Sequence, residues 1–470
     1  MIDRGIFTED PHRKINSEAV DADSPIDLCG IGLGPSNLSL AALLSPITGL
    51  RKVFLEARES FKWHPGLMFP GAELQVSFLK DLVTPVDPTN AFSFLNFLVE
   101  NERLYRFMIA QRGSQVTREE FNQYYAWAAS RIPFAHFGQR VRTVEHDGRS
   151  FVVSSATDRV TRSRHLVVGV GHEPYVPDGV RVPLGDRVVH TNDFLHAGID
   201  FAGKTVVVVG GGQSGAEVID RLLSRRDDLP RHVTWVSRQH GFLPLDDSAF
   251  ANEWFNPAFV RTYYDLPEAS RRTLLQRQRT ASNGISEDLL ERIYRNLYEL
   301  DYLTDAKLTY QLRTSCELLS VDDDGDGLRI VLRDLERDSR QSHYADVAVL
   351  ATGYRHVVPG FLQPLLGTAD LGELKTCFDY SLDWHGAEQG RIYLQNGAEH
   401  THGIADPNLS LAAWRSAVIA NSLLGRDVYR TAEGGSVMWP AGAANNRPDI
   451  GRFSYERPGE PRTSDDPEGA

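Results

Sequence analysis

The chain has 470 residues, which is too long for one compact core and predicts two or three domains. Its composition, 41% hydrophobic and 24% charged residues, is that of an ordinary globular protein. The net charge of -13 argues against a broad basic face, so we expect no nucleic-acid partner.

The two ends of the chain and its cysteines indicate a cellular compartment. The first residues, MIDRGIFTEDPHRK, lack the apolar core of a signal peptide, and no apolar run reaches the roughly 18 residues of a membrane helix. The cysteines, Cys29, Cys316 and Cys377, are far apart and have no metal-binding spacing. We therefore expect a reduced, cytoplasmic protein without a membrane partner. Residues 1–24 and 433–470 are polar and predict a flexible arm and a flexible tail.

The first chemical signature is DLCGIGLGPSNLSLAALL, residues 27–44. It predicts a strand, a glycine turn and a helix whose N-terminus faces a dinucleotide pyrophosphate. The next apolar strand, KVFLEAR, ends in Glu56, whose carboxylate can accept hydrogen bonds from ribose hydroxyls. We interpret this unit as an FAD site. Its candidate cofactor contacts, with Pro35 in place of the third glycine of the motif, are Gly30, Gly32, Gly34, Pro35, Ser36 and Glu56.

A second signature, KTVVVVGGGQSGAEVIDRLL, occupies residues 204–223. It contains a complete G-x-G-x-x-G between an apolar strand and a helix, which is the context that the motif requires. The following strand, HVTWVSR, ends in Arg238 instead of an acid, and an arginine there binds a 2′-phosphate. This unit therefore predicts an NADPH site. Its candidate contacts are Gly210, Gly212, Gln213, Ser214, Gly215 and Arg238.

Two further apolar stretches, HLVVGVGHEPYVP and VAVLATGYRH, end in glycine turns on either side of the second unit. Their placement predicts that the second domain is inserted in the first. The expected fold is α/β, with two Rossmann-like dinucleotide-binding domains and a helical substrate-binding segment. The expected boundaries are 25–199 and 345–432 for the FAD domain, 200–344 for the NADPH domain and 241–310 for the helical segment within it.

The stretch DDDGDG, residues 322–327, resembles the start of a calcium loop. An EF-hand requires an acid at position 12 of that loop, where this chain has Arg333. We therefore predict a hairpin turn between the strands TSCELLSV and LRIVLRDL. The histidines have no metal-ligand spacing, including His400 and His402, so we expect no metal.

Two nucleotide sites in one chain indicate a flavoenzyme that moves a hydride from nicotinamide to flavin. The chain has no C-x-x-C pair, so it lacks the redox pair of a disulfide reductase, and a monooxygenase becomes the best interpretation. Two alternatives remain open at this point. One is a Baeyer–Villiger or sulfur-oxidising flavin monooxygenase, and the other is a flavin- and NADPH-binding redox sensor.

Longer segments carry a resemblance to a known family. FKWHPGLMFPGAELQVSFLKDLV, GGGQSGAE, DDSAFANEWFNPAFV, ATGYR and HTHGIADPNLSLAAWRSA resemble the siderophore-type N-hydroxylating flavin monooxygenases, over about residues 25–430. These enzymes hydroxylate the side-chain amine of L-lysine or L-ornithine, or a diamine. Within the family, WHPG, SNGIS and THGIADP are most similar to the lysine N6-hydroxylases. The resemblance also implies a homo-oligomer, often a tetramer.

The resemblance implies roles for individual residues. Lys80 would bind the substrate carboxylate, Asn252 would hydrogen-bond the reacting amine, and Gln75 would lie beside flavin and nicotinamide, so Gln75 and Asn252 are the catalytic candidates. Leu409, Ser410 and Leu411 would border the isoalloxazine and the substrate chain. The remaining cofactor candidates are Trp63, His64, Thr352, Gly353, Tyr354 and Asp406.

The resemblance also bears on the substrate. Ornithine enzymes carry a second asparagine where this chain has Ala281, so the resemblance favours lysine, with Asn283 as a partial substitute two positions later. A diamine has no carboxylate and would leave the Lys80 cation unpaired. The implied chemistry is the addition of O2 to reduced flavin as a C4a-hydroperoxide, which the neutral amine attacks. Because an ammonium has no lone pair, the amine must bind beside neutral groups such as Asn252.

Overall fold

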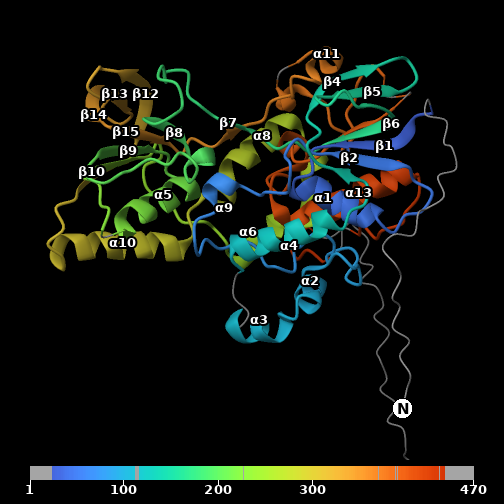
Figure 1. Ribbon diagram of the computed structural model, residues 1–470, viewed down its shortest axis with the longest axis horizontal. Coiled ribbons are helices and arrows are strands. Elements are labelled where there is room, and N and C mark those ends of the chain that lie inside the picture. Colours follow the sequence, from blue (N-terminus) through green and yellow to red (C-terminus); the bar gives the residue numbers. More distant parts are fainter. Residues whose placement is uncertain are drawn as a thin grey trace, which may run out of the picture.

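The computed structural model describes residues 24–111, 116–225, 227–368, 370–386, 388, 390–432 and 435–439. Figure 1 shows two sheets at opposite ends of the molecule, with helices packed against each and a narrow connection between them. The predicted arm, 1–24, and tail, 433–470, lie outside the described residues except for Ser24 and residues 435–439.

The first sheet contains the strands of the predicted FAD domain. Its order is β3-β2-β1-β6-β5-β4, with β17 also paired to β6. The pairs among β1, β2, β3, β6 and β17 are parallel, whereas β4 and β5 form an antiparallel extension. The bounds are β1 Ile26–Ile31, β2 Lys52–Leu55, β3 Ala135–His136, β4 Val141–His146, β5 Phe151–Ser155, β6 Val160–Val168 and β17 Ile392–Leu394.

The second sheet has the order β11-β10-β9-β15-β8, and its pairs are parallel. The bounds are β8 Val188–His190, β9 Thr205–Val209, β10 His232–Val236, β11 Thr309–Arg313 and β15 Val347–Leu350. Both predicted limits of this domain, 200 and 344, therefore need correction, because β8 and β15 pair with each other and belong to the second sheet. The chain returns to the first domain only after β15.

Smaller sheets connect and extend these two. The predicted hairpin around DDDGDG is confirmed, since β12 (Cys316–Asp323) and β13 (Leu328–Asp334) pair antiparallel and β14 (Ser339–Ala345) completes that sheet. The two passages between the domains pair with each other as β7 (Glu173–Pro174) and β16 (Tyr354–Arg355).

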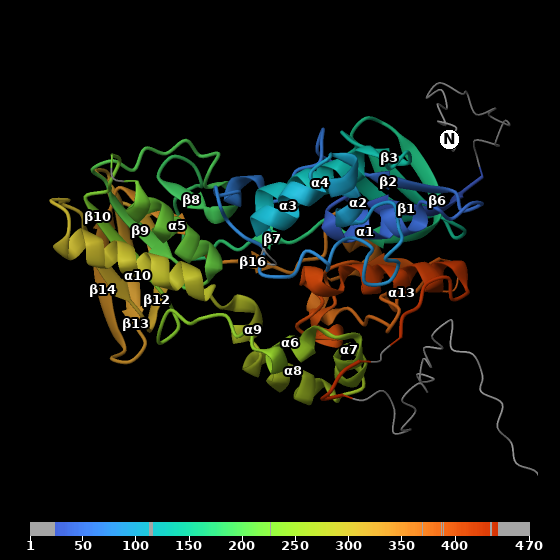
Figure 2. The ribbon, with the colours of Figure 1, turned by 90° about the horizontal axis from the view of Figure 1, so that it is seen from below.

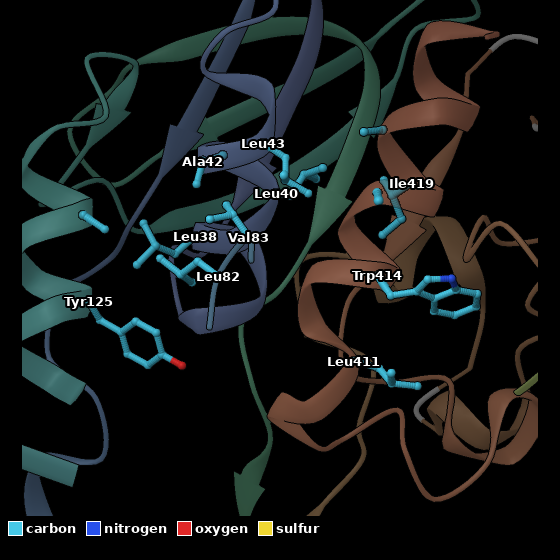
Figure 3. Close-up of a cluster of buried hydrophobic side chains, with 14 of the residues drawn as sticks. Leu38, Leu40, Ala42, Leu43, Leu82, Val83, Tyr125, Leu411, Trp414 and Ile419 are labelled. Atoms are coloured by element: carbon cyan, nitrogen blue, oxygen red, sulfur yellow. The ribbon is translucent and has the colours of Figure 1, made fainter. Parts of the chain in front are cut away.

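Helices cover the sheets and supply most of the core. Those around the first sheet are α1 Pro35–Leu44, α2 Phe94–Glu100, α3 Leu104–Gln111, α4 Arg118–Ser130, α11 Gln363–Leu366, α12 Glu399–His402 and α13 Ala412–Leu424. Figure 3 shows α1 facing α13, with Leu38, Leu40 and Leu43 on one side and Leu411, Trp414 and Ile419 on the other. Helix α1 has no exposed face, because its residues from Asn37 to Leu44 are all buried between the sheet, α4 and α13.

The helical segment 241–310, which was predicted to belong to the NADPH domain, contributes helices to both domains. It forms α6 Ala249–Asn252, α7 Pro257–Tyr264, α8 Glu268–Arg277, α9 Thr280–Asn283 and α10 Glu287–Tyr302. Helix α10 packs on α5 (Gln213–Ser224) against the second sheet through Leu289, Ile293 and Leu297, whereas its Tyr294 is 75% exposed. Helix α7 instead buries Phe259, Val260 and Tyr263 in the core of the first domain, next to α13 (Figure 2).

Short 3-10 turns complete the chain, and one of them meets the described part of the tail. The turns are η1 Pro65–Leu67, η2 Thr191–Asp193, η3 Glu253–Phe255, η4 Leu371–Glu373 and η5 Leu409–Leu411. Ser436 donates a hydrogen bond to Glu253 at 2.6 Å, and the Trp439 ring lies 4.8 Å from that of Phe259. Residues 435–439 therefore differ from the predicted flexible tail, because an aromatic contact and a charge-assisted hydrogen bond hold them against α7 and η3.

None of the helices within the described residues has the length and apolar character needed to cross a bilayer.

Candidate active site

The first glycine turn has the shape of a dinucleotide cradle. Gly32 has φ +83°, and a Cβ on it would lie 2.5 Å from the carbonyl oxygen of Gly169. A Cβ on Gly30 would lie 2.2 Å from the ring of Phe54. Helix α1 begins after Gly34 with Pro35 in its first turn, and no side chain of the described residues caps it. The backbone of this turn is therefore open to an anionic group, as FAD requires.

Glu56 and Asn37 complete this cradle. Glu56 Oε2 accepts the backbone N–H of Leu33 at 2.7 Å, so the carboxylate at the end of β2 faces the turn. The side chain of Asn37 donates to the carbonyl oxygen of Gly32 at 2.7 Å, while its buried Oδ1 has no partner within the described chain. A buried acceptor without a partner suits a ligand with hydrogen-bond donors, such as a ribose or a ribityl chain.

The second turn is equally constrained. Gly210 has φ +139°, and a Cβ there would lie 2.0 Å from the carbonyl oxygen of Ala351. A Cβ on Gly215 would lie 2.1 Å from the carbonyl oxygen of Gly210, so α5 and β9 approach too closely for a side chain. Gly212 is the N-cap of α5 and has no side-chain cap. Arg238 follows β10 and is exposed, where a 2′-phosphate could reach it.

Lys80 and Ser410, both predicted to border the substrate, lie together. Lys80 Nζ donates to Ser410 Oγ at 3.2 Å, which joins the loop after η1 to η5, directly before α13. Burial lowers the pKa of Lys80, and no carboxylate of the described residues forms an ion pair with it. Leu409, next to Ser410, is half-buried against the core of the first domain.

The loop that carries Lys80 is held by a buried carboxylate. Asp81 accepts backbone N–H groups from Val83 at 2.9 Å, Thr84 at 2.7 Å and Phe94 at 2.7 Å. Burial raises the pKa of Asp81, and these hydrogen bonds act in the opposite direction. Sequence reasoning missed this role, although Asp81 directly follows Lys80 in KDLV.

The structure does not bring the two predicted substrate asparagines into contact with Lys80. Asn252 is exposed at the end of α6, and its Nδ2 donates to the carbonyl oxygen of Asp247 at 2.7 Å. Asn283 is exposed at the end of α9, and its backbone carbonyl oxygen lies 3.6 Å from the position that a Cβ on Gly212 would take. Ala281 is buried in the core of the first domain. Asn283 therefore lies beside the second turn, whereas Ala281 faces away from solvent.

Gln75 lies beside the second cradle through a side-chain contact. Its Nε2 donates to Gln213 Oε1 at 3.3 Å. Gln213, the first residue of α5, also accepts the backbone N–H of Ser286 at 2.9 Å and donates to Glu217 at 2.9 Å. Because protein partners occupy both ends of this amide, any cofactor contact by Gln213 would come from its backbone N–H.

Other predicted cofactor residues lie where the domains meet. The hydroxyl of Thr352 donates to the carbonyl oxygen of Tyr175, and the Gly353 carbonyl accepts the Tyr175 N–H at 2.9 Å. Tyr354 lies in β16 and its hydroxyl donates to Asn192 at 3.4 Å.

Trp63 and His64 precede η1 on the side of α4. The Trp63 ring packs edge-on against Tyr125 at 5.5 Å, and His64 has φ +43°. A left-handed backbone at a histidine is uncommon, and here it turns the chain into η1.

Asp406 forms a buried ion pair that sequence reasoning did not anticipate. Its Oδ1 lies 2.9 Å from Arg415 Nη1, and the two side chains are 0% and 3% exposed. Arg415 also donates to Ser36 Oγ at 2.9 Å, in the first turn of α1. Asp406 therefore supports the first glycine turn through Arg415. The signal in the sequence was the single charge of Arg415 within the apolar stretch LSLAAWRSAVIA.

The histidines of HTH are structural. His402 stacks on Tyr380 with ring centroids 4.0 Å apart, and burial lowers its pKa to about 4. His400 contacts the carbonyl oxygen of Leu374 at 2.9 Å. Within the described ranges, no group of three His, Cys, Asp or Glu side chains could hold a metal ion.

Comparisons with known proteins fit this geometry. Residues 24–356 match the family described as L-lysine 6-monooxygenase/L-ornithine 5-monooxygenase. The chain is 36% identical over 409 residues to the L-lysine N6-monooxygenase of Escherichia coli, an alignment that covers 86% of this chain and 96% of that protein.

Two solved structures are also similar. The cadaverine monooxygenase of the desferrioxamine pathway from Erwinia amylovora, bound to FAD, has a TM-score of 0.82 at 32% identity, covering 90% of this chain and 100% of that one. The ornithine N-hydroxylase of Kutzneria sp. 744, with reduced FAD, NADP+ and L-ornithine, has a TM-score of 0.78 at 31% identity, covering 86% and 99%. The chain belongs to the L-lysine 6-monooxygenase/L-ornithine 5-monooxygenase family.

Proposed function

We propose that this protein hydroxylates the side-chain nitrogen of L-lysine and so forms N6-hydroxylysine for a siderophore or a related hydroxamate product. Family membership makes it a flavin-dependent N-monooxygenase that uses FAD, NADPH and O2. The observation that supports an amino-acid substrate is the half-buried Lys80, which has no carboxylate partner in the described part of the chain.

Lys80 favours a substrate that carries its own carboxylate. A cation taken partly out of water without a counter-ion is destabilised, and the lowered pKa of Lys80 expresses that cost. A substrate carboxylate beside Nζ would compensate the charge, and Ser410 Oγ could donate to the same carboxylate. L-lysine and L-ornithine both meet this requirement.

The α9 region supports lysine over ornithine. Ala281 is 5% exposed and packed in the core, so no polar side chain of that position reaches a shorter substrate. Asn283 lies two residues later and beside the second cradle. The resemblance gives ornithine enzymes an asparagine where this chain has the buried Ala281, which favours lysine.

Bound FAD supplies the redox chemistry, taking electrons from NADPH and delivering one oxygen atom of O2 to the amine. The residues of this chain anchor the substrate and govern its protonation. A lysine amine has a pKa near 10.4 in water, and its ammonium form has no lone pair for the new N–O bond. The side-chain carbonyl of Asn252 is neutral, so it stabilises the ammonium less than a carboxylate would and leaves the free base accessible.

A diamine is the second candidate, and it rests on the similarity to the cadaverine monooxygenase. A diamine presents a second ammonium to Lys80 where an amino acid presents a carboxylate. Like charges at that position repel, which would raise KM. The two candidates therefore differ in their response to the charge of Lys80.

An amine panel tests the proposal. NADPH oxidation and hydroxylamine formation would be followed with L-lysine, L-ornithine, cadaverine and putrescine. We expect oxidation matched by hydroxylamine with L-lysine and the highest kcat/KM for that amine. A higher kcat/KM for cadaverine or ornithine would transfer the assignment to that substrate. Peroxide as the only product from every amine would overturn N-hydroxylation itself.

A further inference from the structure

A set of contacts between the domains lies outside the residues assigned above. Arg118, the first residue of α4, donates to both carboxylate oxygens of Glu217 in α5, at 3.0 and 2.7 Å. Helix α4 packs in the first domain and α5 in the second, so the ion pair spans the boundary between them. The side chains are only 17% and 7% exposed. A bidentate pair of this kind fixes both distance and orientation.

The position of Arg118 is unusual for a helix. A cation in the first turn of a helix opposes the helix dipole, whereas Glu119 and Glu120 in the same turn are favourable. Glu217 is also unusual, because it lies among the buried residues Ala216, Val218 and Ile219 of α5. Each charge is therefore poorly suited to its own helix and is compensated by the other across the boundary.

The pair connects to Gln75 by two routes. Through side chains, Glu217 accepts from Gln213 at 2.9 Å, and Gln213 accepts from Gln75 at 3.3 Å. Through the backbone, the Arg118 N–H donates to the carbonyl oxygen of Ala72 at 2.8 Å, and the Leu74 N–H donates to that of Val116 at 2.9 Å. Backbone hydrogen bonds thus link the segment that carries Gln75 to Arg118, the partner of Glu217.

We infer that Arg118 and Glu217 are positioning residues for hydride transfer. In that step a hydride with both its electrons moves from NADPH to FAD, giving NADP+ and reduced FAD. The closed circuit of contacts holds the start of α5, where the nicotinamide nucleotide binds, at a fixed distance and angle from the Gln75 segment of the first domain. The inference rests on FAD and NADPH as cofactors and on Gln75 lying beside them, and it is independent of the amine.

The test compares variants of the Arg118–Glu217 pair with a variant of Asp220, a second acid of α5. Glu217→Gln and Arg118→Gln break the circuit, and Arg118→Lys keeps the charge without the bidentate geometry. Asp220→Asn is the matched control, because Asp220 pairs with Arg292 of α10 at 3.0 Å within the second domain. The measurements are the anaerobic reduction of bound FAD at saturating NADPH, the NADP+ dissociation constant, and backbone hydrogen exchange at Ser286, whose N–H bonds to Gln213.

We expect flavin reduction to slow by about 10–100-fold in Glu217→Gln and Arg118→Gln, because a small misplacement of reactants has effects of this size. Arg118→Lys should recover part of the rate, Asp220→Asn should match the wild type, and NADP+ affinity should change much less than the rate. Exchange at Ser286 should accelerate in the slow variants, with or without FAD.

A removed partner leaves a lone buried charge, so a single variant could fail to fold. The double variant Arg118→Met/Glu217→Met removes both charges and keeps the volume apolar, and it should show the same slow reduction. Unchanged reduction in folded, FAD-loaded variants would overturn the inference, as would equal slowing in Asp220→Asn. Because the assay contains no amine, a wrong substrate assignment would leave its outcome intact.

Discussion

Lys80 Nζ lies 3.2 Å from Ser410 Oγ, a contact between residues 330 positions apart in the chain. If this pair receives the substrate carboxylate, Lys80→Ala should raise KM for L-lysine by roughly 10–100-fold, since a hydrogen bond to a charged group is worth about 1.5–3 kcal/mol. Flavin absorbance should persist, because Lys80 contacts Ser410 and not the glycine turns. Lys62→Ala is the control, because Lys62 is an exposed lysine earlier in the same domain. An unchanged KM would show that the carboxylate binds elsewhere.

The pH dependence of KM follows from the same lysine. Burial lowers the pKa of Lys80, so its cation is lost at a lower pH than that of a free lysine. As pH rises through this lowered pKa, KM for L-lysine should increase, while kcat rises because more substrate amine is neutral. Cadaverine, which has no carboxylate, should show no such increase in KM. The check is a steady-state profile of both amines between pH 7 and the limit of enzyme stability.

Much of the nucleotide-binding architecture could be predicted from sequence because its signals are local. Gly32 and Gly210 adopt positive φ in tight turns, and each turn lies between an apolar strand and a helix within one short window. The hairpin around DDDGDG was local for the same reason. What sequence did not reveal depends on contacts between distant segments: Arg118 meets Glu217 across 99 positions, and the apolar face of α7 has no marker for the domain against which it packs.

Arg238 should determine the choice between NADPH and NADH. It is exposed after β10, at the edge of the second turn. Arg238→Ala should weaken NADPH binding by roughly 10–100-fold through loss of charge-assisted hydrogen bonds to the 2′-phosphate, and it should leave NADH nearly unchanged. Arg231→Ala, at the opposite end of the same strand, is the control for general charge effects. Equal losses for both nucleotides would contradict a role in binding the 2′-phosphate.

The Arg415–Asp406 pair should be important for both stability and FAD retention. Removing one partner leaves a charge that is almost fully buried, which typically costs about 3–5 kcal/mol. Arg415→Leu should therefore lower Tm strongly and, because Arg415 bonds to Ser36 in the first turn of α1, reduce FAD content. Arg272→Ala, from the exposed pair with Glu268, should change Tm little. Calorimetry and flavin absorbance measure the two effects, and full FAD occupancy in Arg415→Leu would separate the ion pair from cofactor binding.

Ala281 tests whether the ornithine asparagine could be restored at its aligned position. The residue is 5% exposed in an apolar core with Phe255 and Phe259, so Ala281→Asn buries an amide without partners in a packed space. We expect a loss of about 1–3 kcal/mol in unfolding free energy and no gain in activity with L-ornithine. Asn283→Ala is the comparison: the exposed side chain should leave stability unchanged, and KM for L-lysine should rise if Asn283 contacts the substrate. Increased ornithine turnover in a stable Ala281→Asn variant would show that position 281 faces the substrate, and it would remove the argument for lysine over ornithine, because Lys80 suits both amino acids.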